Sequence, residues 1–193
     1  MISLEVEGLA KFGTYFQSAP ERAKKAASLA LNQTADRKVV PASRDLIMEQ
    51  INFPAGYLNG ERLYVKERAN PNHLEATVAG RDRPTSLLRF ASLGPNRTIL
   101  GVTVGRRASR PVRRGFVIGL RSGNAGFAVR LKAGETLHGS RGAKQIGGDG
   151  RLWLLYGPSV NQAFLSVADE LTPKFLDELS VEFLRQFARD NLL

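Results

Sequence analysis

The stretch RLWLLYGPSV, Arg151–Val160, decides the fold, because the chain changes there from one periodicity to another. Its first part, Arg151–Tyr156, is a short apolar run with aromatic residues, which is typical of a β-strand. Gly157 and Pro158 then favour a turn, and Ser159 is a good helix N-cap residue. The stretch therefore predicts a last strand that turns directly into C-terminal helices.

Beyond this turn the sequence predicts two helices separated by Pro173. The first has one apolar stripe at helical spacing, formed by Val160, Phe164, Val167, Ala168 and Leu171. Pro173 lacks the N–H that a helix interior needs, so a new helix is expected to begin there with Thr172 as its cap. Large apolar residues then recur every four positions, at Phe175, Leu179, Phe183 and Phe187. These four predict an interface helix that docks on the sheet or on a neighbouring molecule.

The N-terminal part predicts a helix, a bend and a second helix. Ser18 and Glu21 form a capping box, with a proline early in the first turn. A narrow stripe of small residues follows and predicts a packing face, at Ala23, Ala27, Ala30, Leu31, Thr34 and Ala35. Pro41 predicts an end or a kink, beyond which an apolar face continues to Ile51.

Between the helices the sequence changes to short β-branched runs separated by Gly, Pro and Asn. The expected strands are Arg62–Arg68, Leu74–Ala79, Thr98–Val104, Gly115–Leu120, Phe127–Lys132 and Arg151–Tyr156. Their alternation predicts one buried and one solvated face. We therefore expect an α+β fold, with a mostly antiparallel sheet or partial barrel packed against N-terminal and C-terminal helices. The length favours a single domain over residues 1–193.

Three connections in this sheet have a distinct composition. VGRRASRPVRRGF, Val104–Phe116, is expected to be a basic hairpin, and its arginines are Arg106, Arg107, Arg110, Arg113 and Arg114. RSGNAG, Arg121–Gly126, is expected to be a tight turn, because Gly and Asn tolerate positive φ. GSRGAKQIGGDG, Gly139–Gly150, is rich in glycine and predicts a flexible loop.

The net charge of +10 is concentrated in the middle of the chain. Residues 81–151 hold 15 basic and 3 acidic side chains, whereas residues 152–193 hold 3 and 6. A localised basic surface attracts phosphates or acidic partners, and arginine suits both. The arginine hairpin therefore contacts a nucleic acid or a protein, or it only keeps a loop in water. Contact with a nucleic acid would be made to phosphates, since Phe116 is the only aromatic residue of the hairpin.

The sequence gives little support to an enzyme. His73 and His138 lie in segments of different character and at no metal-ligand spacing. Asp149 has no evident second catalytic group, and a turn aspartate in water is the commoner situation. The glycines of 139–150 match no nucleotide-binding motif. We therefore predict no catalytic residue, no metal and no cofactor.

The composition also bears on the compartment. The chain has no cysteine, so it forms no disulfide and no thiolate metal site. Glu5 and Glu7 stand where a signal peptide would carry lysines, and no apolar run approaches the roughly 18 residues of a membrane span. We expect a soluble intracellular product without a membrane partner.

Six short motifs occur in a recognisable order along most of the chain: ALNQTA at 30–35, RPTSLLRF at 83–90, GVTV at 101–104, RRGFV at 113–117, SGN at 122–124 and LYGPSV at 155–160. In this combination the sequence resembles the prophage minor tail protein Z family, the tail completion proteins of lambda-like bacteriophages. LYGPSV is the most distinctive of the six, and none of them is catalytic.

The resemblance implies a structural virion protein at the head–tail junction, or neck, of a tailed phage, made in the cytoplasm of the host bacterium. It further implies a ring around the DNA channel, hexameric by analogy with tail symmetry, that joins tail to head. The implied partners are other copies of the chain, tail terminator or tail tube proteins, head-completion or connector proteins, and phage DNA. In this setting Tyr156, Gly157, Pro158 and Ser159 form an assembly and turn motif. The alternative is a sequence-nonspecific nucleic-acid-binding protein that uses the arginine-rich hairpin.

Overall fold

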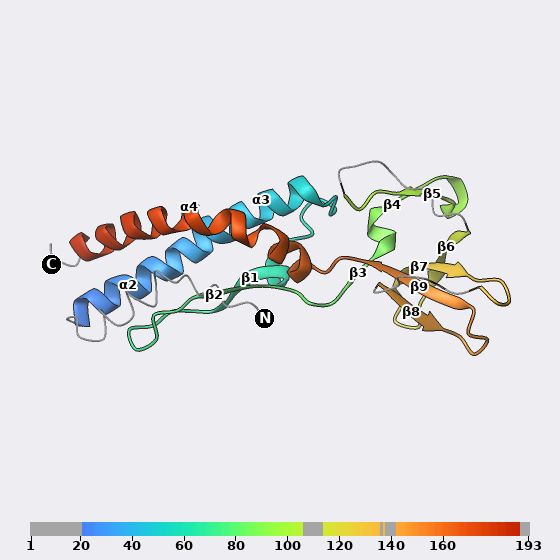
Figure 1. Cartoon of the computed structure of the whole chain (residues 1–193), viewed down its shortest axis with the longest axis horizontal. Helices are drawn as coiled ribbons and strands as arrows, with labels where there is room; N and C mark the ends of the chain where they lie inside the picture. Colours follow the sequence, from blue (N-terminus) through green and yellow to red (C-terminus); the bar gives the residue numbers. More distant parts are fainter. Residues whose placement is uncertain (1–20, 106–113, 136, 138–141, 190–193) are drawn as a thin grey trace. The chain divides into compact units, whose positions relative to one another are not determined.

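A computed structural model describes residues 21–105, 114–135, 137 and 142–189 (Figure 1). The chain forms two compact units. Unit 1 comprises residues 1–47, 58–81 and 161–193, and unit 2 comprises residues 48–57 and 82–160. The single domain over 1–193 stays a prediction, because two compact units of one chain can still unfold in one cooperative transition.

The first helical segment of unit 1 is longer than expected. Helix α2 (Glu21–Thr34) continues through a π-helical segment, η1 (Ala35–Val39), into α3 (Val40–Gln50). The helix does not end at Pro41. The irregularity lies just before the proline, where the Val40 N–H donates to the Ala35 carbonyl five residues back. The predicted packing stripe is confirmed, since its members are buried apart from the half-buried Leu31.

The C-terminal part is one helix, α4 (Val160–Arg189), so the predicted division at Pro173 is wrong. Proline removes one backbone hydrogen bond, but Leu171 just before it is buried and Phe175 just after it is half-buried, and this packing outweighs that loss. The stripe predicted for the first half is confirmed, with Phe164 and Val167 fully buried. A side-chain bond joins α4 to α2, because Arg185 Nη2 donates to Gln33 Oε1 at 2.9 Å.

A small antiparallel sheet completes unit 1. Strand β1 (Leu63–Glu67) pairs with β2 (Thr77–Gly80), with Leu63 opposite Gly80. The Asn32 amide of α2 holds the chain that follows β1, since it donates to the Ala69 carbonyl and accepts from the Ala69 N–H, both at 2.9 Å. The largest buried apolar side chains of unit 1 are Phe164, Ile47, Leu58 and Leu63.

Unit 2 is built on a curled antiparallel sheet, which confirms the predicted α+β class. Its strands are β3 (Thr85–Ser86), β6 (Gly115–Gly119), β7 (Ala125–Arg130), β8 (Ala143–Ile146) and β9 (Leu152–Gly157). Their order is β3–β9–β7–β6, and β8 also pairs with β9. A separate hairpin joins β4 (Ala91–Leu93) to β5 (Ile99–Val102), and short helical turns η3 (Leu87–Phe90) and η4 (Pro95–Arg97) flank β4. One more turn, η2 (Gly60–Arg62), precedes β1 in unit 1.

Two expectations about this sheet are wrong. The segment 139–150 is not a loop throughout: 139–141 lie outside the described residues, but 143–146 form β8, paired with β9 from Ala143↔Leu155 to Ile146↔Leu152. Strand β7 does not have one wet face, because Phe127, Ala128 and Val129 are all buried. A central strand of a curled sheet is covered on both sides, and this removes the simple alternation.

Candidate functional site

The two units differ sharply in charge. Unit 1 holds 14 basic and 14 acidic residues, whereas unit 2 holds 14 basic and 4 acidic residues. Unit 2 therefore carries the whole net charge of +10. A compact body with this excess has a positive surface potential that attracts polyanions and acidic proteins. This sheet unit is the candidate interaction site.

The arginine hairpin is only partly described. Arg106, Arg107, Arg110 and Arg113 lie outside the described residues. Arg114 is described and has a left-handed backbone with φ of 66°, an uncommon conformation for a residue with a side chain. Arg114 stands immediately before β6, so it is the residue at which the hairpin joins the sheet.

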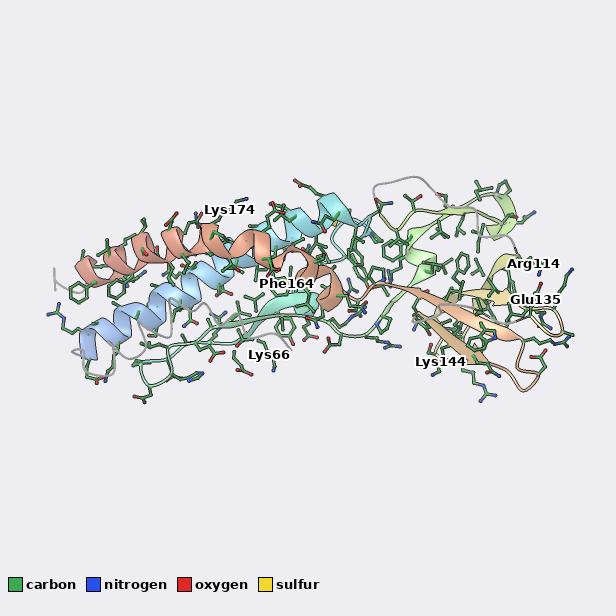
Figure 2. All side chains as sticks on the ribbon, viewed as in Figure 1. Lys66, Arg114, Glu135, Lys144, Phe164 and Lys174 are labelled. Atoms are coloured by element: carbon green, nitrogen blue, oxygen red, sulfur yellow. The ribbon has the colours of Figure 1, made fainter. Side chains whose placement is uncertain are left out.

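Glu135 holds Arg114 in place, and Figure 2 shows the two side chains next to each other. Arg114 Nη1 donates to both carboxylate oxygens, at 2.8 and 2.9 Å. The Lys132 N–H donates to the same carboxylate at 2.7 Å. This backbone bond, followed by the Arg114 bond, lowers the pKa of Glu135 below its usual value. One of the five predicted contact arginines is thus already partnered within the chain.

A second acidic residue, Asp149, pairs with two cations at the β8–β9 turn. Arg151 Nε lies 3.5 Å and Arg130 Nη1 lies 3.8 Å from Asp149 Oδ2. The pKa of Asp149 is lowered, mainly because its carboxylate accepts the Arg151 N–H at 3.2 Å. Asp149 thus lies at the surface of this turn, with its carboxylate partnered by two arginines.

Other cations of unit 2 keep their charge available to a partner. Arg83, Arg121 and Lys144 are exposed, and none of them pairs with a carboxylate in the described part of the chain. Arg89 lies over the Tyr57 ring, 5.0 Å from the centroid, and remains exposed. All four lie within the basic range 81–151, but the sequence singled out only the hairpin, because a lone arginine or lysine has no local pattern that shows whether it is exposed and unpaired.

The LYGPSV motif meets the RPTSLLRF motif in unit 2. Thr85 pairs with Gly157 and Ser86 pairs with Tyr156, across β3 and β9. A Cβ at Gly157 would lie 2.8 Å from the buried Phe90 ring, so glycine is needed for this close approach. Pro158 and the buried Ser159 follow, and α4 begins at Val160. The predicted turn from the last strand into the C-terminal helix is confirmed.

The buried Tyr57 and Thr85 hydroxyls lie 3.2 Å apart and satisfy each other at the same place. Tyr57 also stacks on Phe53, with ring centroids 5.2 Å apart. The motif residues therefore form a structural junction within unit 2.

The predicted interface helix is the second half of α4. Phe175, Leu179, Phe183 and Phe187 are all half-buried in the structure. Phe183 and Phe187 stack with ring centroids 5.9 Å apart. Beside them Val181 and Leu184 are 68% and 65% exposed. An apolar helix surface of this kind suits contact with another protein.

The described residues contain no group of three or more His, Cys, Asp or Glu side chains that could hold a metal ion. His73 lies at the surface beside Glu75, with 3.4 Å between Nε2 and Oε2, and His138 lies outside the described residues. None of the helices within the described ranges has the length and apolar character needed to cross a membrane.

In comparisons with known proteins, no family model, no curated protein and no solved structure matches the chain.

Proposed function

We propose that this chain is a structural protein of a tailed bacteriophage, a tail completion or neck component that assembles as a ring around the DNA channel. In this role it joins the tail to the head and makes no chemical change to a substrate. The motif resemblance suggests the setting. The unequal division of charge between the two units is the observation that carries the proposal.

A neck protein needs two kinds of surface in one chain. It must bind neighbouring proteins, and it must tolerate or hold the DNA that passes through it. Unit 1 is electrically neutral and exposes apolar side chains of α4 at Val181 and Leu184, which suits protein contact. Unit 2 carries the net charge of +10, which suits contact with DNA phosphates.

The direct test is to image intact particles, or the purified neck, by electron cryo-microscopy at side-chain resolution. The proposal expects this chain as a ring between head and tail, with unit 2 facing the DNA. Absence of the chain from purified particles contradicts the proposal.

A genetic test addresses the arginine hairpin. Reversal of Arg106, Arg107 and Arg110 to glutamate should impair head–tail joining or DNA delivery while the purified chain stays folded. Glutamate in place of Arg37, Lys174 and Arg189, three exposed residues of unit 1, is a matched control that changes the charge by the same amount. Normal yields of infectious particles with the hairpin variant contradict a role for these arginines.

The alternative is a sequence-nonspecific nucleic-acid-binding protein, and the same charge excess of unit 2 favours it. This function expects the purified chain to bind duplex or single-stranded DNA at about 50 mM salt. Affinity should fall steeply as salt rises, because released counterions drive the binding. Absence of binding at low salt excludes this alternative.

A further inference from the structure

Strand β6 leaves one edge of the unit 2 sheet open. Among the described strands it pairs only with β7, along the register Gly115↔Val129 to Gly119↔Ala125. The Leu120 N–H donates to the Asn124 carbonyl at the hairpin end. Hydrogen-bonding residues alternate in an antiparallel ladder, so Val117 and Gly119 direct their backbone groups away from β7. Within the described part of the chain, these groups form a row of donors and acceptors without a strand partner.

A groove runs along this open edge. It has a volume of about 500 Å³ and is lined by Gly115, Phe116, Val117 and Gly119 of β6. Asn96, Thr98 and Ile99 also line it, as do Gly123, Asn124 and Ala125 at the β6–β7 connection. Strand β5 contributes Ile99 and pairs only with β4 among the described strands. The groove is therefore a slot beside an unpaired strand, a shape that suits an extended peptide.

The charge of unit 2 restricts what can occupy the slot. A second β6 edge would bring two bodies of charge +10 together, and their repulsion disfavours this symmetric pairing. An acidic extended segment is attracted instead. Such a segment occurs in this chain at Ile2–Gly8, ISLEVEG, which has two glutamates, no basic residue and alternating apolar residues. Alternation of this kind is the pattern of a strand.

We propose that the slot beside β6 binds the segment Ile2–Gly8 of a second copy of this chain by strand addition. Backbone hydrogen bonds to the β6 edge supply affinity, and Glu5 and Glu7 supply attraction to the basic unit. Because donor segment and acceptor slot are different surfaces, the contact is heterologous, and its repetition generates a ring or an open chain. The inference rests on the proposed function for the assumption that copies of the chain meet.

The test uses a fluorescently labelled ISLEVEG peptide and the chain that lacks residues 2–8. We expect saturable binding of one peptide per chain. The Val117→Pro variant removes the outward N–H, which an edge strand tolerates, and should weaken binding at least tenfold. Val117→Ala keeps the N–H and serves as the matched control. Equal affinity of the Pro and Ala variants for the peptide overturns the proposal.

Variants of the peptide provide a test that leaves the protein unaltered and does not depend on the folding of Val117→Pro. A peptide with Glu5→Lys and Glu7→Lys, and one N-methylated at alternate residues, should each bind at least tenfold more weakly. Unchanged affinity of both altered peptides would mean that neither the glutamates nor backbone hydrogen bonds to β6 contribute to binding, and it overturns the proposal.

Analytical ultracentrifugation of the full chain tests whether the segment in the slot comes from a second copy. Self-association should occur in the full chain and fall sharply in the chain lacking residues 2–8. Association that persists without these residues shows that another surface joins the copies and overturns the choice of occupant. A neck ring seen in particles built with the shortened chain would leave the proposed function standing while this inference fails.

Discussion

Units 1 and 2 reach a compact state by different means and are suited to different partners. Unit 1 packs small residues of α2 and large residues of α4 into a helical core and balances its charges. Unit 2 buries its central strand on both faces and keeps an excess of ten positive charges. A neutral and a strongly basic unit can both form a stable core, because net charge lies at the surface and affects association more than the fold. The difference in charge between the units therefore bears on which partners each unit binds rather than on how each unit folds.

The largest expected effect comes from removing one core ring in each unit. Phe164→Ala in unit 1 and Phe127→Ala in unit 2 each delete a ring that is at most 1% exposed (Phe164 is labelled in Figure 2). Each should lower the free energy of unfolding by about 3–5 kcal/mol, from lost burial and the cavity left behind. Denaturant titration followed by fluorescence and circular dichroism measures this loss.

The same pair of variants tests whether the two units unfold together. If the chain is a single domain, both substitutions shift one shared transition. A second transition that stays at the wild-type midpoint in either variant contradicts the single-domain prediction and makes the units independent.

A smaller effect is expected at the motif junction in unit 2. In Gly157→Ala the new methyl group would lie 2.8 Å from Phe90 Cε2 and 3.3 Å from Cδ2. Because Phe90 is buried, we expect a loss of about 1–3 kcal/mol in the free energy of unfolding. Gly148→Ala is the matched control, since no atom lies within 4 Å of its added Cβ. Equal stability of the two variants would refute the packing role of Gly157.

The smallest effect concerns the Glu135 carboxylate. Its folded pKa is lowered, so its contribution to stability is present above its unfolded pKa and is lost as pH falls through the folded pKa. In Arg114→Gln the pKa of Glu135 should rise but stay below its usual value, because the Lys132 N–H bond remains. Carboxyl titration by NMR measures both values. A full return to the ordinary pKa would show that Arg114 alone is responsible.

The sequence predicted elements with strong periodicity and missed those that depend on tertiary packing. The α2 stripe, the first half of α4 and the β9-to-α4 turn follow from spacing and turn residues that act locally. The continuity of α4 through Pro173 does not, because it depends on the tertiary packing of the buried Leu171 and the half-buried Phe175. Strand β8 is four residues long and borders a glycine turn, so its pattern is too short to recognise. Pairing with β9 stabilises it.

The candidate site shows the same limit. The arginine hairpin was visible as a run of charge, and Arg114 shows that part of such a run is already paired. The ion pair between Arg114 and Glu135 links residues 21 positions apart, and no local sequence pattern predicts it. The sequence places Arg83, Arg121 and Lys144 in the basic range 81–151, but only the structure shows that they are exposed and pair with no carboxylate of the described residues.

The π segment Ala35–Val39 has a consequence for insertions and deletions. Counting an uninterrupted α-helix from the buried Ala35 places the next inward positions at about 39, 42 and 46. The buried residues are instead Val40, Ser43 and Ile47, one position later each time. The helix thus holds one residue more than its core-facing pattern requires, as an insertion would produce. Deletion of the exposed Arg37 should turn the segment into regular α-helix and keep Ile47 in the core, so loss of one residue would here restore regularity.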